Sequence, residues 1–237
     1  MKTSLISRAL LITLVLGSVD LAAGTVQQLK VRERIDPVFP QGLLLKGITR
    51  GAVRCVVDVD ATGRVEDVLV LAHTDEQFAR VVDEALRLWS FEPARLDGQP
   101  VPAQTTLEFS IEAVGAVTSL DLVSYVGLQF RTIWGDPYTY QPRQLKELDA
   151  IPLPKRSVKP SYPVALAERA VRGRVRVDFY IDERGQVRVP IVTQSDHPEL
   201  AAAAMTAVRQ WQFEPPLRRG RPVLVQASQD FDFEHAP

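Results

Sequence analysis

The five residues Trp89–Pro93 read WSFEP, and Trp211–Pro215 read WQFEP. A shift of 122 residues superimposes the two phrases. The same shift lays residues 51–112 on residues 173–234 without a gap, with 20 identical residues in 62 aligned positions. Such self-similarity indicates one domain used twice, because a spacing of 122 is far longer than the roughly 20–50 residues of a solenoid repeat.

The pattern predicts the same order of elements in each copy. A Pro-x-aromatic-Pro motif comes first, and a short helical stretch follows it, at residues 164–172 in the second copy, where Gly173 is the expected stop. Alternating apolar residues then predict a strand, a tight Asp-x-x-Gly turn and a second strand, which together make a β-hairpin. In the second copy this hairpin covers residues 175–194, and in the first it covers residues 53–72.

An amphipathic helix and a long strand complete each copy. Thr74 and Asp196 stand where a capping residue would begin the helix, and the prolines of WSFEP and WQFEP forbid its continuation. The Trp and Phe of each phrase are interpreted as core residues rather than as a site. Alternation then predicts final strands over residues 101–111 and 223–233. The predicted fold class is α+β: two tandem α-β-β-α-β domains, each a three-stranded antiparallel-type sheet covered by helices.

The N-terminus has the pattern of an export signal. Lys2 and Arg8 precede an apolar run over residues 9–19, and Ala22-Ala23-Gly24 supplies the small residues of a cleavage site. Because the run is too short to span the roughly 30 Å core of a bilayer, residues 1–24 are predicted to be a signal peptide. The alternative is an uncleaved inner-membrane anchor. The predicted location is periplasmic in either case.

The remaining boundaries follow from the repeat. Copy one is placed at residues 27–112 and copy two at residues 148–235, and these names are kept below. Residues 113–147, the connector, are too apolar for a disordered spacer and are expected to dock on one domain or to join the two.

Composition and motifs give little support to catalysis, metal binding or nucleic-acid binding. The formal net charge is −1, and there is no long basic run to neutralise phosphates. The three histidines form no ligand cluster with Cys55, which is interpreted as a small core residue. Ser195-Asp196-His197 are adjacent at a helix start, where capping explains them better than a catalytic triad. No cofactor is expected.

The ordered motifs resemble the TonB C-terminal domain family. The resemblance rests on Pro-x-Tyr-Pro, Gly-x-Val-x-Val-x-Phe-x-Ile-Asp-x-x-Gly-x-Val, Ala-Val-x-x-Trp-x-Phe-x-Pro, Gly-x-Pro-Val and a terminal Phe-x-Phe, and it is closer in copy two than in copy one. It implies a periplasmic module of an energy transducer that pairs an extended segment of an outer-membrane transporter with the edge of its last strand. An inner-membrane, proton-driven motor is the second partner that the resemblance implies.

Carried over to this chain, the resemblance selects two stretches of copy two as the partner-binding site. These are the Pro-x-Tyr-Pro region and the start of the last strand, with the candidate residues Lys159, Pro160, Tyr162, Pro163, Val223, Leu224, Val225, Gln226, Ala227, Ser228 and Gln229. The equivalent edge of copy one is residues 101–111, with Pro37, Phe39 and Pro40 nearby. An exposed sheet edge can accept such a strand because its backbone groups are unpaired.

Three features depart from the family pattern: the chain has no long Pro-rich spacer, its N-terminal apolar segment contains no histidine, and Lys159 stands where the family has glutamine before Pro-x-Tyr-Pro. The alternative function is a non-catalytic scaffolding protein of the periplasm, whose domains pair with each other or form a homodimer and thereby close the edges that a partner would need.

Overall fold

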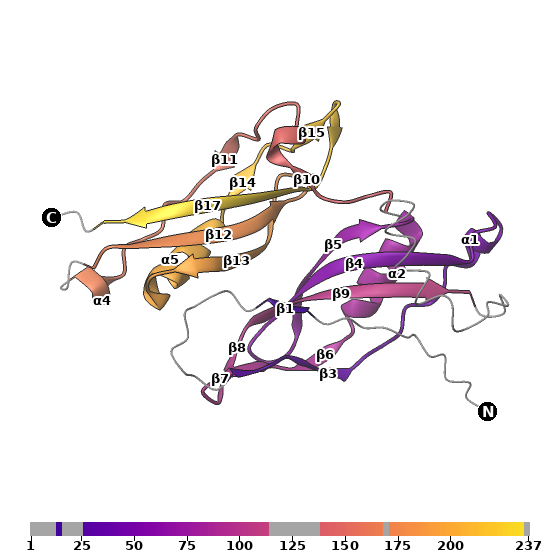
Figure 1. The fold of residues 1–237 in the computed structure, drawn as a ribbon, viewed down its shortest axis with the longest axis horizontal. Helices are drawn as coiled ribbons and strands as arrows, with labels where there is room; N and C mark the ends of the chain where they lie inside the picture. Colours follow the sequence, from indigo (N-terminus) through magenta and orange to yellow (C-terminus); the bar gives the residue numbers. More distant parts are fainter. Residues whose placement is uncertain (1–12, 16–25, 114–137, 168–170, 235–237) are drawn as a thin grey trace. The chain divides into compact units, whose positions relative to one another are not determined.

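The computed structural model describes residues 13–15, 26–113, 138–167 and 171–234 (Figure 1). These divide into two compact units. Residues 28–94 and 105–141 make most of the first, and residues 142–237 make most of the second. None of the helices in the described part of the chain is both long and apolar enough to span a membrane.

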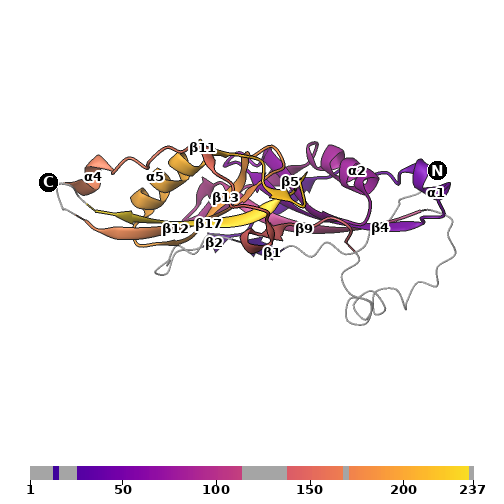
Figure 2. The ribbon, with the colours of Figure 1, turned by 90° about the horizontal axis from the view of Figure 1, so that it is seen from above.

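Copy one is built on a hairpin and a return strand. The main sheet has the order β1-β9-β4-β5, in which β4 and β5 are antiparallel neighbours. The helix α2 packs over one face of this sheet (Figure 2). The elements of this part are β1 (Thr13–Val15), β2 (Val26–Gln27), β3 (Lys30–Glu33), α1 (Gln41–Leu44), β4 (Arg50–Val59), β5 (Val65–His73), α2 (Glu76–Leu86), β6 (Ser90–Glu92), β7 (Ala94–Leu96), β8 (Gln99–Val101) and β9 (Ala103–Glu112).

Copy two repeats the plan. Its main sheet has the order β10-β17-β12-β13, and α5 covers one face (Figure 2). The elements are β10 (Arg143–Gln144), the 3-10 turn η1 (Leu145–Glu147), β11 (Pro154–Arg156), α4 (Val164–Ala167), β12 (Gly173–Ile181), β13 (Val187–Ser195), α5 (Pro198–Val208), β14 (Gln212–Phe213), β15 (Leu217–Arg218), β16 (Arg221–Pro222) and β17 (Val225–Phe233). The predicted α+β class with two tandem domains is confirmed, but each main sheet has four strands instead of the predicted three, because the short β1 or β10 joins its edge.

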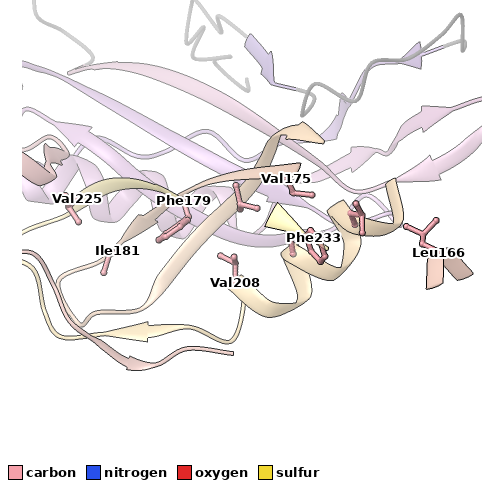
Figure 3. Close-up of a cluster of buried hydrophobic side chains, with 10 residues drawn as sticks. Leu166, Val175, Phe179, Ile181, Val208, Val225 and Phe233 are labelled. Atoms are coloured by element: carbon pink, nitrogen blue, oxygen red, sulfur yellow. The ribbon is translucent and has the colours of Figure 1, made fainter. Parts of the chain in front are cut away.

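The core lies between each sheet and its helix, on the alternate residues that the sequence predicts. Val53, Cys55, Val57 and Val59 of β4 are all fully buried. In copy two the core cluster joins β12, β17, α4 and α5 (Figure 3): Leu166, Val175, Val177, Phe179, Ile181, Leu200, Ala204, Val208, Val225 and Phe233. Burying a side chain of this size contributes about 1.5–3 kcal/mol, so this layer dominates the stability of each small sheet.

The repeated phrase WSFEP/WQFEP forms part of this core but does not end the helix. α2 ends at Leu86 and α5 at Val208, well before Pro93 and Pro215, so the prediction that the prolines stop the helices is wrong. Instead Ser90–Glu92 and Gln212–Phe213 form strands that pair with β3 and β11. The indole N–H of Trp89 donates to the carbonyl oxygen of Ile35 at 2.9 Å, and that of Trp211 donates to Val158 at 2.8 Å.

The hairpin glycines are required by this phrase. Gly63 has φ +88°, and a Cβ there would lie 2.0 Å from the carbonyl oxygen of Phe91. Gly185 has φ +81° and the same 2.0 Å approach to Phe213. The amide of Phe91 in turn donates to Gly63, and that of Phe213 to Gly185, each at 2.8 Å. Each turn is therefore locked to the strand that follows the helix, which explains why both copies carry glycine here.

Three local predictions are corrected. The helix cap of α2 is Asp75, and that of α5 is His197, one residue after the predicted Thr74 and Asp196. Thr74 and Asp196 instead accept hydrogen bonds from the backbone amides of Ala52 and Arg174 and so tie the helix start to the neighbouring strand. Gly173 is the first residue of β12 rather than a helix stop; a side chain there would collide with Leu200.

Two further boundaries differ, and two predictions lie mostly outside the described residues. The final strand of copy one is broken at Pro102, between β8 and β9, and that of copy two begins at Val225 instead of Val223. Pro102 interrupts the ladder because proline has no amide hydrogen to donate. The predicted signal peptide, except for Thr13–Val15, and most of the connector fall outside the described residues.

Candidate peptide-binding edge of copy two

The strand β17 has one fully paired side and one largely open side. Towards the sheet it pairs with β12 along its whole length, from Val225 opposite Ile181 to Phe233 opposite Gly173. On its other side the neighbour is β10, whose two residues lie parallel to Val225 and Gln226. From Ala227 to Phe233, no strand in the described part of the chain pairs with the outer side of β17. This stretch is called the open edge below.

The short strand β10 comes from the end of the connector. The amide of Arg143 donates to the carbonyl oxygen of Leu224 at 2.8 Å, and the chain then turns away through η1. The turn is closed by Glu147, whose carboxylate accepts from the amide of Gln144 at 2.9 Å, and this bond holds the pKa of Glu147 below its usual value. The chain thus adds one strand of its own to the edge and then frees the rest of it.

The start of copy two, directly after the connector, is fixed by a second carboxylate. Asp149 accepts hydrogen bonds from the amides of Arg219 (2.7 Å) and Gly220 (2.8 Å), at the tip of the β15–β16 hairpin. The amides of Gly220 and Arg219 hold the pKa of Asp149 below its usual range. These contacts keep β10 in place beside β17.

The apolar face of the open edge is only partly covered. Val225 and Phe233, at the two ends of β17, are buried, whereas Ala227, Gln229 and Phe231 between them are half-buried. The ring of Phe231 lies 5.6 Å from that of Trp211, which is itself half-buried. An additional strand beside β17 would therefore cover aromatic surface as well as pair with backbone groups.

The polar face of the open edge is acidic. From Val225 to Glu234 the chain carries three acidic side chains, Asp230, Asp232 and Glu234, and no basic one. Asp232 pairs with Arg174 at 2.9 Å, and this partner raises the pKa of the Arg174 guanidinium. Asp230 lies 3.8 Å from Arg176 and keeps 56% of its side chain exposed. Opposite charges favour each other across strands, so a partner strand with basic or neutral side chains on this face is preferred.

The predicted Pro-x-Tyr-Pro stretch has a structural function. The Tyr162 hydroxyl donates to the carbonyl oxygen of Val171, and the ring packs on the core of copy two. Lys159 is exposed, next to Val158, whose carbonyl oxygen holds Trp211. Tyr162 therefore fixes the chain between α4 and β12. Pro160 and Pro163 are half-buried, whereas Lys159 and Ser161 are exposed where a partner could contact them.

The predicted site residues at the start of the last strand, 223–229, separate into three groups in the structure. Val223 and Leu224 precede β17, and Leu224 is buried. Val225 and Gln226 are paired by β10 on the outer side. Ala227, Ser228 and Gln229 lie on the open edge, which continues to Phe233. The residues that the sequence reasoning missed are Arg143 and Gln144, because a two-residue strand has no periodicity to reveal it.

Copy one treats its equivalent edge differently. The neighbour of β9 on that side is β1, Thr13–Val15. The inward residues of β9 are all buried: Ala103, Thr105, Leu107, Phe109 and Ile111. Phe39, the counterpart of Tyr162, has no hydroxyl and packs edge-on against Phe78, with ring centroids 5.4 Å apart. The core-facing side chains of β9 are therefore covered throughout, whereas those in the middle of β17 are only partly covered.

The other residues that could carry out chemistry, Ser195, Asp196, His197 and Cys55, make contacts that belong to the fold. The hydroxyl of Ser195 donates to the carbonyl oxygen of His197, and Asp196 accepts from Arg174, so the three adjacent residues do not converge. Cys55 is buried, and burial raises the pKa of its thiol. Among the residues that the structure describes, no three His, Cys, Asp or Glu side chains are grouped where they could hold a metal ion.

Comparison with known proteins points to one family. The family model described as "Gram-negative bacterial TonB protein C-terminal" matches twice, at residues 35–112 and 158–235. Two curated relatives are each named "Protein TonB". The one from Vibrio cholerae serotype O1 is 31% identical over 67 residues, covering 28% of this chain and 28% of the relative. The one from Pseudomonas aeruginosa is 31% identical over 96 residues, covering 39% of this chain and 28% of the relative.

Two solved structures also match parts of the chain. "Solution NMR structure of Pseudomonas aeruginosa TonB CTD" has 30% identity and a TM-score of 0.33, covering 39% of this chain and 92% of that one. A structure titled "Molecular characterization of the tonb2 protein from vibrio anguillarum" has 25% identity and a TM-score of 0.31, covering 36% of this chain and 82% of that one. The matched part spans less than a third of the curated relatives' length. Because the family model matches both copies and most of the chain, this protein belongs to the TonB C-terminal domain family.

Proposed function

We propose that this protein is a periplasmic, TonB-like binding module that recognises an extended segment of an outer-membrane transporter by strand addition to copy two. The observation that carries the proposal is the open edge of β17. Seven consecutive residues, Ala227–Phe233, have no strand on their outer side in the described part of the chain. Adding a strand there supplies backbone hydrogen bonds, each worth about 0.5–1.5 kcal/mol net.

The chain's own β10 supports this mode of binding. It pairs with the same side of the same strand, in parallel, and brings Arg143 to this edge. An incoming segment would continue where β10 leaves, along Ala227–Phe233. The stretch of β17 that is free to pair with a partner is shorter than the sequence predicts, because β10 already pairs with Val225 and Gln226. The incoming segment would place apolar side chains beside Phe231 and neutral or basic side chains beside Asp230 and Asp232.

Site-specific crosslinking tests the proposal in the full chain. A photo-reactive amino acid replaces Ser228, which is exposed on the open edge, and Thr206, which is exposed on α5, serves as the control position. The chain is expressed in a Gram-negative host, and adducts are identified by mass spectrometry. Adducts with an outer-membrane transporter from position 228 and none from position 206 are the expected result. Equal adducts from both positions, or none from a folded chain, would overturn it.

The second candidate is the scaffolding function, in which the edge is closed within or between copies of this chain. The pairing of β10 with Val225 and Gln226 favours it, since the chain already closes part of the edge itself. Hydrogen exchange of the full chain without a ligand separates the two functions. Slow exchange of every amide over 227–233 favours a closed edge. Fast exchange of alternate amides, which become protected when transporter protein is added, favours strand addition.

A further inference from the structure

A segment of the connector lies on the polar face of the copy-one sheet. The hydroxyl of Tyr138 donates to the Glu108 carboxylate at 3.1 Å, and the Arg54 guanidinium carbon lies 5.1 Å from the centre of the Tyr138 ring. Arg54 and Glu108 also form an ion pair, with Nη2 2.6 Å from Oε1. The tyrosine is thus held at two points: its ring by a cation and its hydroxyl by a carboxylate.

The next two residues are held by the end of β5. The hydroxyl of Thr139 lies within hydrogen-bond distance of the carbonyl oxygens of His73 (3.2 Å) and Thr74 (3.1 Å). Tyr140 makes a one-residue antiparallel bridge with His73, and its ring stacks on the imidazole with centroids 4.9 Å apart. Tyr138–Tyr140 is therefore bound as a short extended peptide would be, by side-chain pockets and by backbone pairing.

The internal repeat places a matching set of groups on copy two. The shift of 122 residues takes Arg54 to Arg176 and Glu108 to Asp230. Arg176 and Asp230 are cross-strand partners in β12 and β17, and their charged groups lie 3.8 Å apart. The strand ends match as well, because Val53 pairs with His73 in copy one and Val175 pairs with Ser195 in copy two.

The copy-two set is more exposed than the copy-one set, although Arg176 also contacts the Asp178 carboxylate at 3.5 Å and the Ser228 hydroxyl at 3.0 Å. The Arg176 side chain is 44% exposed, against 29% for Arg54, and Asp230 is 56% exposed, against 35% for Glu108. In the described part of the chain, no aromatic ring stacks on Arg176 and no segment bridges Ser195. A pocket opens at the same end of the sheet, lined by Arg172, Gly173, Arg174, Gln194, Asp196, Asp232, Phe233 and Glu234.

From this match we propose that copy two binds a tyrosine-containing extended peptide of another protein on the polar face of its sheet. The tyrosine ring would lie over Arg176 and its hydroxyl would donate to Asp230. The residue after it would reach the carbonyl oxygens of Ser195 and Asp196. This surface runs from Asp230 on β17 across Arg176 on β12 to the end of β13, so it shares Asp230 with the open edge. The proposal does not depend on the transporter-binding function.

The match also predicts which positions of the peptide matter. The first position requires tyrosine, because phenylalanine cannot donate to Asp230. The third position requires no aromatic residue, since Ser195 replaces the imidazole of His73 on which Tyr140 stacks. The specificity of copy two is therefore for one tyrosine, whereas copy one holds two.

A fluorescently labelled peptide with the sequence of residues 136–141, DPYTYQ, serves as the probe. It is titrated with the full chain, and the dissociation constant is measured by fluorescence anisotropy. Binding in the micromolar to millimolar range is expected. Arg176→Ala should weaken it about two- to fivefold, the usual contribution of an exposed cation–π contact. Arg184→Ala, in the exposed β12–β13 turn, removes the same charge at the other end of the sheet and should change nothing.

The peptide supplies the second half of the test. The Tyr138→Phe peptide should bind roughly tenfold more weakly, because a hydrogen bond to a charged acceptor is lost. That difference should shrink with Asp230→Asn protein, which is the coupling expected of two groups in contact. The Tyr140→Ala peptide should bind within about twofold of the parent, since the stacking partner is absent in copy two.

Several outcomes would overturn the proposal. Equal affinity for the Tyr and Phe peptides, or equal losses from Arg176→Ala and Arg184→Ala, would show that these groups do not hold the tyrosine. If the protein self-associates, and Arg176→Ala abolishes the association while the peptide does not reduce it, a second molecule of this protein would be the occupant. Each variant is checked for an unchanged circular dichroism spectrum before binding is measured.

Discussion

Copies one and two share a sheet, a hairpin and a core, but they differ in what covers the sheet. In copy one the inward face of β9 is buried throughout, β1 is its neighbour, and Tyr138 covers Arg54. In copy two the middle of β17 is half-buried, β10 covers two residues of its edge, and the Arg176 side chain is 44% exposed, against 29% for Arg54. A duplicated domain can therefore keep the same interior in both copies while the surfaces of the two copies differ. Because copy two is the less covered copy, we propose both interactions for it.

The largest expected effect on stability is the loss of either tryptophan, and the two losses should differ. Trp89 is 4% exposed and Trp211 is half-buried, although both occupy the same phrase. Trp89→Ala should lower the free energy of unfolding by roughly 3–5 kcal/mol, and Trp211→Ala should lie at the lower end of that range. Urea unfolding of the full chain, followed by circular dichroism, measures both. A larger loss for Trp211→Ala would show that copy two is packed as tightly as copy one.

The hairpin glycines test what the copies share. Gly63→Ala and Gly185→Ala force a Cβ to within 2.0 Å of a backbone oxygen and strain a positive φ, so each should cost roughly 3 kcal/mol. Gly98 and Gly220 also have positive φ, but nothing lies within 4 Å of their Cβ positions. Their alanine variants are matched controls and should cost about 1 kcal/mol. Thermal unfolding separates the two pairs; equal losses would mean that backbone strain alone requires glycine.

The first turns of α2 and α5 should also differ in stability between the copies, by a smaller free energy. Asp75 caps α2 by accepting from the amide of Gln77 at 2.9 Å, whereas His197 makes no side-chain cap to α5. Asp75→Ala should cost about 1 kcal/mol, and His197→Ala should remain within about 0.5 kcal/mol of the parent. Urea unfolding again gives both values. Equal losses would indicate that His197 contributes a contact besides capping.

The smallest effect concerns Asp149, the carboxylate that fixes the start of copy two to the β15–β16 hairpin. The pKa of Asp149 is held below its usual value, so its stabilising bonds exist above the unfolded-state pKa of about 3.9 and are lost as the pH falls through the lower folded-state pKa. The amide proton shift of Gly220 should therefore titrate with a midpoint below about 3.9. In Asp149→Asn this titration should disappear. A midpoint at or above the ordinary value would show that the two amide bonds are not formed in solution.

Most of the core could be predicted from the sequence, and the predictions that failed have a common cause. Alternating apolar residues placed Val53–Val59 and Val175–Ile181 correctly because burial of one strand face depends on local period alone. The predicted caps Thr74 and Asp196 were wrong by one residue. Their oxygens accept instead from Ala52 and Arg174, which are 22 residues away. The sequence cannot show whether a hydroxyl or carboxylate accepts from an amide of its own helix or from an amide of a distant strand.

By itself the sequence determined the duplication, the fold class and the alternation that fills each core. It did so because these features are carried by side chains at fixed spacings. Only the tertiary structure decided how much of the β17 edge stays open, since that depends on Arg143 and Gln144 pairing through backbone groups that every residue possesses. It also decided that Tyr138 covers Arg54 while Arg176 keeps more of its side chain exposed, because the Tyr138–Arg54 contact joins residues 84 positions apart with no local pattern between them.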